Sequence, residues 1–395
     1  MFLVSLALVA APPCAPDNGG LKLPANLCAS VVARGVGGVR HLVVAPNGDV
    51  FVAVVGPDGG VLALRDADGD GTYETVRRFG PEGGNGIALT RDWLYFAPND
   101  RVIRWRWKPG QLEPTGEPEV VVSGLPTGGH TSKQIAIGPD GMLYVNVGSR
   151  TNSCQEADRQ PRSPGRQPCT ELEERAGIWR FVAHRTGQTP ATGERFATGI
   201  RNGMALGFQP GTGALFVATH GRDQLSANWG FSDEYNAENP AEELAIVPKG
   251  GNLGWPYCYY DTGLRRKVLA PEYGGDGKKE GNCGSMLQPA VVFPAHWGPM
   301  ALAFAGGTAL PPEWRHGVFV AFHGSWNRAP LPQQGFRVVF APFGPDHRPT
   351  GAFKDFALAA GQPTSIRPSG VAVGRDGSVY IAADHSGMIW RVVAK

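Results

Sequence analysis

Short apolar segments alternate with glycine-rich turns along the whole chain, and one pattern recurs six times. In each copy an apolar strand, a tight turn and a second apolar strand follow one another. Turns such as PNGD, PDGM and RDGS contain the residues that adopt positive φ in β-hairpins. We therefore predict six hairpins, which begin near residues 41, 85, 134, 204, 301 and 370.

Six copies of one hairpin predict a repeat architecture, because β-propellers are built from four-stranded blades of about 40 to 50 residues. Six such blades use the whole length of 395 residues. We expect an all-β fold, a six-bladed β-propeller that forms a single domain over residues 14–395. The apolar segments near 27–32 and 388–393 are predicted to pair and close the ring, because an open array leaves strand edges exposed.

The later copies are spaced more widely than the first three, which predicts long insertions in the later blades. Three segments stand out, residues 150–175, 221–243 and 258–285. Additional length in a repeat protein lies in loops on one face, and functional residues concentrate in such loops. We expect these loop insertions to cover one shared face of the propeller.

Charged residues make up 18% of the chain and the net charge is +2, so no basic surface for nucleic acid is predicted. A small molecule is the expected partner. Residues 1–13 contain an apolar run with the length of a signal-peptide core, which is too short to span a bilayer. We predict an N-terminal leader, a periplasmic or secreted location and no transmembrane span, with a lipid anchor at Cys14 as the alternative.

The six cysteines form three pairs that are close in sequence, and they contain no CxxC motif for a metal or a haem. Short loops close at a modest cost in entropy, and export exposes thiols to oxidising conditions. We therefore predict three disulfides, Cys14–Cys28, Cys154–Cys169 and Cys258–Cys283.

His130 lies four residues ahead of a predicted strand, in the segment GGHTSKQIAIGPDG. The inner strands of a propeller border its central channel, so a histidine at the start of one is placed to accept a proton. The ordinary pKa of imidazole also suits a general base. A surface or capping histidine is the alternative interpretation.

A second group of candidates surrounds the fourth hairpin. Arg201 and Asn202 precede its first strand, and His220, Gly221, Arg222 and Asp223 follow its second strand. An arginine fork matches a carboxylate, and the backbone carbonyls of a glycine-containing loop suit a hard cation such as calcium. A salt-bridged turn would give the same pattern.

Two acidic segments are candidates for calcium ligands. The first is equally typical of a solvated loop and contains Asp233, Glu234, Glu238, Glu242 and Glu243. The second is DADGDGTYE, which begins at Asp66 like a calcium-binding loop. Its twelfth position is Arg77 and not the bidentate glutamate of an EF-hand, so we interpret it as a polar turn of a blade.

Further basic residues lie beside the hairpins. His296, Arg328 and Arg367 each adjoin one, and together with Arg201 they predict a ring of cations at the mouth of the channel. Converging cations indicate a polyanionic ligand or cofactor. The chain has no P-loop, nucleophile elbow or HExxH motif.

The motifs HTSKQIAIGPDGMLYVNVGS, TGIRNGMAL, HGRD, PKGGNLGWPYC and IRPSGVAV occur in this order. Together they resemble the soluble PQQ-dependent sugar dehydrogenases, most closely the L-sorbosone dehydrogenase branch. The resemblance extends from about Cys14 to Arg391. It implies a six-bladed propeller with pyrroloquinoline quinone (PQQ) across the top of the channel, beside a calcium ion.

The resemblance implies a role for the candidates of the third and fourth hairpins. His130 would be the general base that takes a hydroxyl proton while hydride passes to the quinone. Arg201 would bind the reactive quinone oxygen, with Asn202 beside it. The backbone carbonyls of Gly221 and Arg222 would bind calcium, which leaves the Arg222 side chain free.

The resemblance also implies the remaining contacts. His220 and His296 correspond to residues beside the cofactor, and Arg367 to a cation that pairs with one of the three PQQ carboxylates. Asp384 and His385 would lie near the substrate.

Three positions depart from the family pattern, and these departures would affect the affinity for PQQ and the specificity for the sugar. Arg328, in HGSWNR, is our candidate for the place of a lysine that the glucose-oxidising branch has against the cofactor. Ser369 replaces a second arginine, and Gly129 replaces an acidic neighbour of the base.

These observations predict an exported, PQQ- and calcium-dependent dehydrogenase. It would oxidise the anomeric hydroxyl of an aldose, or a hydrated aldehyde such as that of sorbosone, and pass electrons to a quinone, a cytochrome or a dye. Two alternatives stay open. One is a calcium-dependent lactonase in which His130 activates water, and the other is a propeller that binds a ligand without catalysis.

Overall fold

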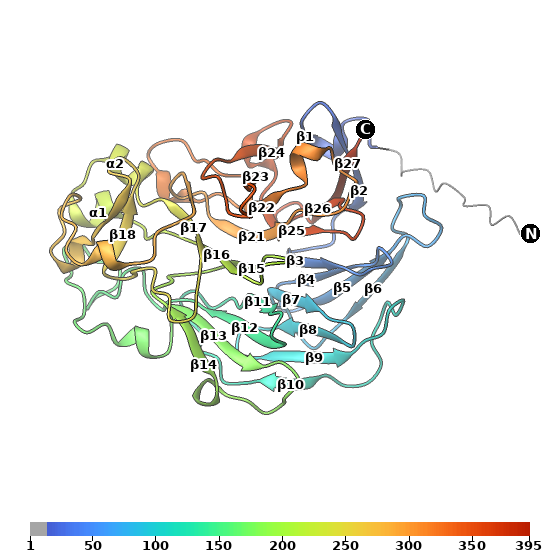
Figure 1. Ribbon diagram of the computed structural model, residues 1–395, viewed down its shortest axis with the longest axis horizontal. Helices are drawn as coiled ribbons and strands as arrows, with labels where there is room; N and C mark the ends of the chain where they lie inside the picture. Colours follow the sequence, from blue (N-terminus) through green and yellow to red (C-terminus); the bar gives the residue numbers. More distant parts are fainter. Residues whose placement is uncertain (1–13) are drawn as a thin grey trace, which may run out of the picture.

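The strands form a ring of six antiparallel blades around a central channel (Figure 1). The computed structural model describes residues 14–395, so the predicted leader lies outside the described residues. The first three blades have regular four-stranded order. Their strands are β3 (Val39–Val44), β4 (Val50–Val54), β5 (Gly60–Arg65) and β6 (Thr75–Phe79); β7 (Gly86–Leu89), β8 (Trp93–Ala97), β9 (Val102–Arg106) and β10 (Glu119–Val122); β11 (Ile135–Ile137), β12 (Met142–Val147), β13 (Gly177–Val182) and β14 (Glu194–Thr198).

The last three blades carry the additions. Blade 4 is interrupted between its third and fourth strands, blade 5 gains an edge strand, and blade 6 is completed by the N-terminal segment. Their strands are β15 (Ala205–Phe208), β16 (Leu215–Thr219), β17 (Glu242–Ile246) and β20 (Val291–Phe293); β21 (Pro299–Phe304), β22 (Gly317–Phe322), β23 (Arg337–Pro342), β24 (Lys354–Ala359) and β1 (Leu21–Lys22); β25 (Pro368–Val373), β26 (Val379–Ala383), β27 (Met388–Ala394) and β2 (Leu27–Ala33).

The six predicted hairpins are the inner two strands of the six blades. In the turns of the first, third and sixth hairpins, Gly48, Gly141 and Gly377 have φ values of 92°, 73° and 93°. Only glycine adopts this conformation freely, which explains the recurrence of NG and DG in these turns. The predicted six-bladed all-β fold is therefore confirmed.

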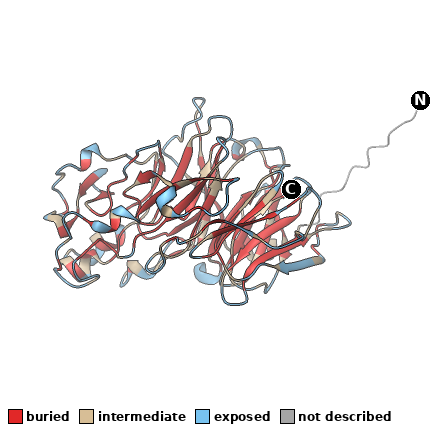
Figure 2. Cartoon of the chain, turned by 90° about the horizontal axis from the view of Figure 1, so that it is seen from below, coloured by how far each residue is buried: buried red, intermediate tan, exposed pale blue. Residues whose placement is uncertain are grey.

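The core is divided among the spaces between neighbouring blades. Because most sheets pack on both faces, their middle strands have no polar side; every residue of β4 and of β22 is buried. Figure 2 shows this as buried strands with exposed residues mainly at the turns and edges.

Ring closure is as predicted. Strand β2 pairs with β27, with Leu27 opposite Ala394 and Val31 opposite Trp390. The buried indole of Trp390 donates a hydrogen bond to the carbonyl of Gly19 at 2.9 Å. Strand β1 also joins β24, so the first described residues connect blades 5 and 6.

The three predicted disulfides are present, Cys14–Cys28, Cys154–Cys169 and Cys258–Cys283. The second and third lie in the predicted insertions. These contain helices α1 (Leu225–Trp229) and α2 (Asp233–Glu238) and a separate hairpin, β18 (Cys258–Asp261) with β19 (Arg266–Leu269). Figure 1 shows α1, α2 and β18 grouped at one side of the ring.

Strand direction brings selected residues to one face, which we call the site face. Each inner strand (β3, β7, β11, β15, β21, β25) begins on this face, and the antiparallel second strand (β4, β8, β12, β16, β22, β26) ends there. The site face therefore collects the residues that precede each hairpin and those that follow it.

We predict that deletion of residues 24–34 opens the ring and sharply lowers the melting temperature. The deletion leaves the edge of β27 unpaired, and loss of a buried leucine side chain such as Leu27 alone costs about 2–5 kcal/mol. The matched control is the double variant Cys14→Ser/Cys28→Ser, which removes the disulfide but keeps the strand. Equal melting temperatures for the deletion and the double variant would show that β2 does not hold the ring.

Candidate functional site

His130 lies before β11, and within residues 14–395 only its Nδ1 has a hydrogen-bond partner. Its Nδ1 is 3.0 Å from both the carbonyl oxygen and the hydroxyl of Ser149. The hydroxyl donates to the carbonyl of Thr151 at 2.7 Å. Because the Ser149 carbonyl can only accept, Nδ1 carries the proton and Nε2 keeps its lone pair. The ring is therefore in the tautomer that a general base needs.

Three imidazoles in this region are neutral at physiological pH. Burial, followed by the charge of Arg201 and the proximity of His220, lowers the pKa of His130 to about 3. Burial lowers the pKa of His220 to about 4, and its Nε2 donates to the carbonyl of Pro299 at 2.8 Å. Burial also lowers the pKa of His41, on β3, to about 4.

Asp223 connects three blades and their insertions. Its carboxylate accepts from Arg201 at 2.8 Å and from Arg159 at 2.9 Å, and it also accepts from Asn327. Burial alone would raise the pKa of this carboxyl, but Arg201, His296 and Arg159 hold it well below its usual range. Asp223 is the aspartate of the HGRD motif, and the sequence placed it among the candidates after the fourth hairpin without a role of its own.

Arg201 is buried within this network and lies beside Asn202, as predicted. Its Nη1 donates to the carbonyl of Gly221 at 2.8 Å, and its other bonds go to Asn152 and Asp223. The Asn202 side chain accepts from Asn146 at 3.2 Å. Arg201 is thus held in place by the protein itself.

The Gly221–Arg222 backbone is supported from the core side. The amides of Gly221 and Gly298 donate to the two oxygens of Glu242, at 2.9 and 3.1 Å. Burial raises the pKa of Glu242 to about 8, against the effect of these donors. Among residues 14–395 no donor binds the carbonyl of Arg222, so that oxygen is available to a ligand.

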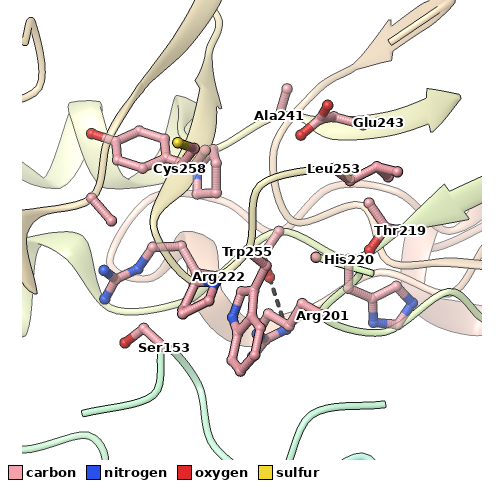
Figure 3. Close-up of a pocket in the computed structure, with 16 residues that line it drawn as sticks. Ser153, Arg201, Thr219, His220, Arg222, Ala241, Glu243, Leu253, Trp255 and Cys258 are labelled. Atoms are coloured by element: carbon pink, nitrogen blue, oxygen red, sulfur yellow. Dashed lines mark hydrogen bonds between the residues drawn. The ribbon is translucent and has the colours of Figure 1, made fainter. Parts of the chain in front are cut away.

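The Arg222 side chain is not free, in contrast to our expectation. Its Nη1 binds both oxygens of the buried Glu272, at 2.6 and 2.5 Å. This buried pair ties the site to the β18–β19 insertion. Figure 3 shows the Arg222 guanidinium extended away from His220 and toward Ser153.

A second polar group lies across the site face and includes two residues that we did not predict, Arg40 and His323. His323 Nε2 is 3.0 Å from both oxygens of Asp384, and Arg367 Nη2 is 3.0 Å from His323 Nδ1. Arg40 contacts Asp384 at 3.3 Å, and its buried Nε has no partner within the described chain. The sequence signals were the histidine that opens HGSWNR and the arginine before the first hairpin.

Asp384 was expected near the substrate, and it is also the centre of a polar network with Arg40 and His323. Burial would raise its pKa, but His323, Arg40 and Arg367 lower it, so the carboxylate is ionised. The neighbouring His385 is exposed.

The predicted ring of cations does not form around the channel. Arg328 is buried, and its guanidinium binds the carbonyls of Ala237 and Pro332 and the carboxylate of Glu238. It therefore holds the end of α2 and offers no place for the lysine-like contact that we expected. The sequence placed Arg328 near a hairpin but carried no information on the direction of its side chain.

His296 is also turned toward the insertion. Its Nε2 is 2.8 Å from the carbonyl of Asn236 and 3.2 Å from that of Asn239, and the residue is buried. It supports the segment after α2 and does not present this nitrogen to the site face.

The structure explains the two other departures from the family pattern. Gly129 has a φ of 61°, and a Cβ there would lie 2.2 Å from the carbonyl oxygen of Arg150. An acidic residue does not fit this backbone. Ser369 is buried and donates to the carbonyl of Val39 at 2.8 Å, so it joins blades 6 and 1.

The first acidic segment does not converge on one point. Helix α2 carries Asp233, Glu234 and Glu238, whereas Glu242 and Glu243 are buried in β17. Glu243 pairs with the buried Lys267 at 2.7 Å. In the second segment the carboxylates of Asp66, Asp68 and Glu74 do lie close together. The glutamate is Glu74, three residues before Arg77, which occupies the twelfth position of the loop.

A small cavity lies behind Gly221 and Arg222, between blade 4 and the insertions (Figure 3). Arg201, His220, Trp255 and Glu243 are among the residues that line it. Its volume of about 30 Å³ accommodates about two water molecules. This cavity is therefore too small for a sugar or a larger cofactor.

Residues 21–395 match the family model described as TrAA12-like. The chain belongs to the TrAA12-like family.

Two curated relatives of the TrAA12-like chain match shorter regions. An uncharacterized protein of Borreliella burgdorferi is 27% identical over 204 residues, 50% of this chain and 48% of that protein. A pyrroloquinoline quinone-dependent pyranose dehydrogenase of Coprinopsis cinerea is 25% identical over 185 residues, 40% of this chain and 24% of that protein. The matches thus span about half and about a quarter of these relatives.

Solved structures confirm the fold of the TrAA12-like chain. The calcium structure of the Trichoderma reesei family AA12 protein has a TM-score of 0.80 at 18% identity and covers 95% of this chain and 97% of that one. The holo form of the Coprinopsis cinerea pyranose dehydrogenase PQQ domain has a TM-score of 0.78 at 19% identity, with 94% and 97% covered.

The predicted resemblance to soluble PQQ-dependent sugar dehydrogenases is confirmed at the level of the family. The L-sorbosone dehydrogenase branch stays a prediction. Within residues 14–395 no helix is long and apolar enough to cross a membrane.

The buried histidines predict how the stability of the TrAA12-like chain depends on pH. His41 is protonated near pH 6.5 in the unfolded chain but only near pH 4 in the folded one, so the unfolded state binds the extra proton between these values. The free energy of unfolding should fall as pH falls through this window, by up to about 1.4 kcal/mol per pH unit for this group.

Denaturant unfolding at pH 7, 6, 5 and 4 would test this for wild type and His41→Gln, whose amide can still donate to the carbonyl of Met300. We expect the variant to lose stability less steeply with acid. Identical slopes for the two proteins would remove His41 from the pH dependence.

Proposed function

We propose that this chain is an exported PQQ- and calcium-dependent dehydrogenase that oxidises a sugar. The substrate would be the anomeric hydroxyl of an aldose or a hydrated aldehyde such as that of sorbosone. The observation that carries the proposal is His130, whose Nδ1 is held by the Ser149 carbonyl and whose Nε2, without a partner in the described part of the chain, is left as the base. Membership of the TrAA12-like family and the similarity to a PQQ-dependent pyranose dehydrogenase support it.

The residues of the site face fit PQQ, which is planar and carries three carboxylates. Arg40 and Arg367 come from two neighbouring blades and meet at Asp384 and His323. The buried, unpaired Nε of Arg40 is a donor that a carboxylate would satisfy. We assign this corner of the site face to a cofactor carboxylate, with Arg40 and His323 in place of the predicted Arg328.

The fit to calcium rests on backbone oxygens. The unpaired carbonyl of Arg222 is a hard ligand of the kind that calcium prefers, and Gly221 lies beside it with its amide fixed by Glu242. The carbonyl of Gly221 already accepts from Arg201, so it would be shared between that donor and the ion. When bound, PQQ would accept the two electrons of the oxidation and calcium would stabilise negative charge on the quinone.

The chemistry of the protein side chains follows from their geometry. His130 would take the hydroxyl proton at Nε2, and the Ser149 carbonyl, which accepts from Nδ1, would stabilise the imidazolium that forms. Burial and Arg201 keep His130 neutral before the reaction, and an anionic ligand beside it would raise its pKa toward a value better suited to a base. Asp223 would keep Arg201 oriented toward the Gly221 carbonyl.

We further propose a periplasmic or secreted location and an electron acceptor such as a quinone or a cytochrome. Three disulfides are typical of proteins that fold under oxidising conditions. A bound two-electron cofactor must also be reoxidised by a partner after each turnover.

Reconstitution tests the proposed function. The purified protein, stripped of metal with a chelator, would be mixed with calcium and PQQ and assayed for a change in quinone absorbance and for dye reduction with a panel of sugars. We expect both signals, and both should be lost when calcium is left out. Cofactor binding without any sugar oxidation would favour a binding propeller, and hydrolysis of a lactone would favour the hydrolase.

His130→Ala should keep PQQ binding but reduce kcat by about 10²- to 10⁴-fold, because only the proton acceptor is removed. Cofactor affinity from quinone absorbance and steady-state kinetics would be measured side by side. His184→Ala is the control, since His184 is an exposed histidine. A wild-type kcat in His130→Ala would exclude this residue as the base.

A further inference from the structure

The loop that carries His130 is held in an unusual way. Residues 126–131 form the sequence PTGGHT, in which Gly128 and Gly129 both have positive φ, 81° and 61°. Within the described chain only two backbone hydrogen bonds involve this loop, from the His130 amide to the Ser149 carbonyl and from the Thr131 amide to the Gly129 carbonyl, both 3.0 Å. Neither bond satisfies the carbonyls at the ends of the loop.

Two basic side chains, those of Lys133 and Arg175, bind carbonyls at the ends of the loop and within it. The Lys133 ammonium group donates to the carbonyl of Pro126 at 2.9 Å and to the carbonyl of Thr131. Arg175 donates to the carbonyls of Thr127 at 2.6 Å and Gly128 at 3.1 Å. Four of the six carbonyls of the loop are thus bound by these two side chains.

Lys133 is the more unusual of the two. Its exposed fraction is 0%, and within residues 14–395 its ammonium group binds two backbone carbonyls and no carboxylate. The charged groups that face it are Arg175, from the segment before β13, and Asp100, from the turn between β8 and β9. A buried ammonium group without a counter-ion destabilises a protein, and an apolar residue would fill the same space at lower cost.

We propose that Lys133 is a positioning residue for His130, which it places by joining the two ends of the loop on either side of the imidazole. The proposal rests on the proposed role of His130 as the base. A proton acceptor must lie within a few tenths of an ångström of its productive position, and the two glycines give this loop little rigidity of its own. The two bonds of Lys133 supply that rigidity.

The same arrangement makes the loop sensitive to alkaline pH. Burial, and then the charge of Arg175, lowers the pKa of Lys133 to about 7, while Asp100 acts in the opposite direction. Below this pH the ammonium group makes charge-assisted bonds to the carbonyls of Pro126 and Thr131, and above it a neutral amine makes weaker ones. The loop should therefore loosen, and kcat should fall, as pH rises above about 7.

Lys133→Met and Lys133→Arg test the proposal. The first removes both donors while keeping a side chain of similar length, and the second keeps a cation that does not lose its proton. Lys267→Met is the matched control, because Lys267 is also buried and also binds a carbonyl, that of Leu253, but lies on β19 in the insertion.

Hydrogen exchange of the protein without cofactor provides the first measurement. We expect Lys133→Met to raise amide exchange in residues 126–132, and Lys267→Met to leave that segment unchanged. Unchanged exchange there in Lys133→Met would overturn the proposal. This measurement does not depend on activity, so it separates the positioning role from the proposed function.

Kinetics of the reconstituted enzyme provide the second measurement. Lys133→Met should lower kcat by about 10- to 100-fold with the KM for sugar and the affinity for PQQ little changed, because a misplaced base affects the chemical step. Lys133→Arg should recover most of kcat and lose the decline above about pH 7. A kcat of Lys133→Met equal to that of Lys267→Met, or a decline that persists in Lys133→Arg, would contradict the proposal.

Discussion

The pairing of β2 with β27 is the interaction on which the arrangement of the other blades depends. The last blade has only three strands from its own part of the chain, and its fourth strand comes from the opposite end of the sequence. Each inner strand contacts the next around the channel, including β25 with β3. A site built from the ends of strands in several blades keeps its geometry only while this ring is closed.

Within the ring, buried ionisable side chains determine the position of the reactive groups. Asp223 holds Arg201, and Glu242 holds the Gly221 amide. Glu272 holds Arg222, and the carbonyls beside His130 are held by Lys133. A buried charge costs free energy unless it is paired or hydrogen-bonded, so such groups are typically retained where they serve a purpose beyond stability. Here the supporting groups surround the segments that border the site face.

The insertions supply side chains that support the residues of the site. The insertion of residues 150–175 supplies Asn152 and Arg159 to the Arg201–Asp223 network, and the turn that follows β19 supplies Glu272. The 150–175 insertion also explains the glycine at position 129, because the carbonyl of Arg150 occupies the space that a Cβ would need there. The site thus differs from its family pattern where an inserted loop packs against the strands.

The sequence alone determined the six hairpins, the closure of the ring, the three disulfides and the positions of the insertions. These features depend on local turn chemistry, on the alternation of apolar segments with glycine-rich turns and on pairs of residues close in the chain. The motifs around His130, Arg201 and Gly221 were visible for the same reason. Only the tertiary structure decided which cations face the ligand, since side-chain direction depends on neighbours from other blades. Arg328 and His296 bind the insertion, whereas Arg40 and His323 meet Arg367 and Asp384 from three blades, and no spacing along the chain records that contact.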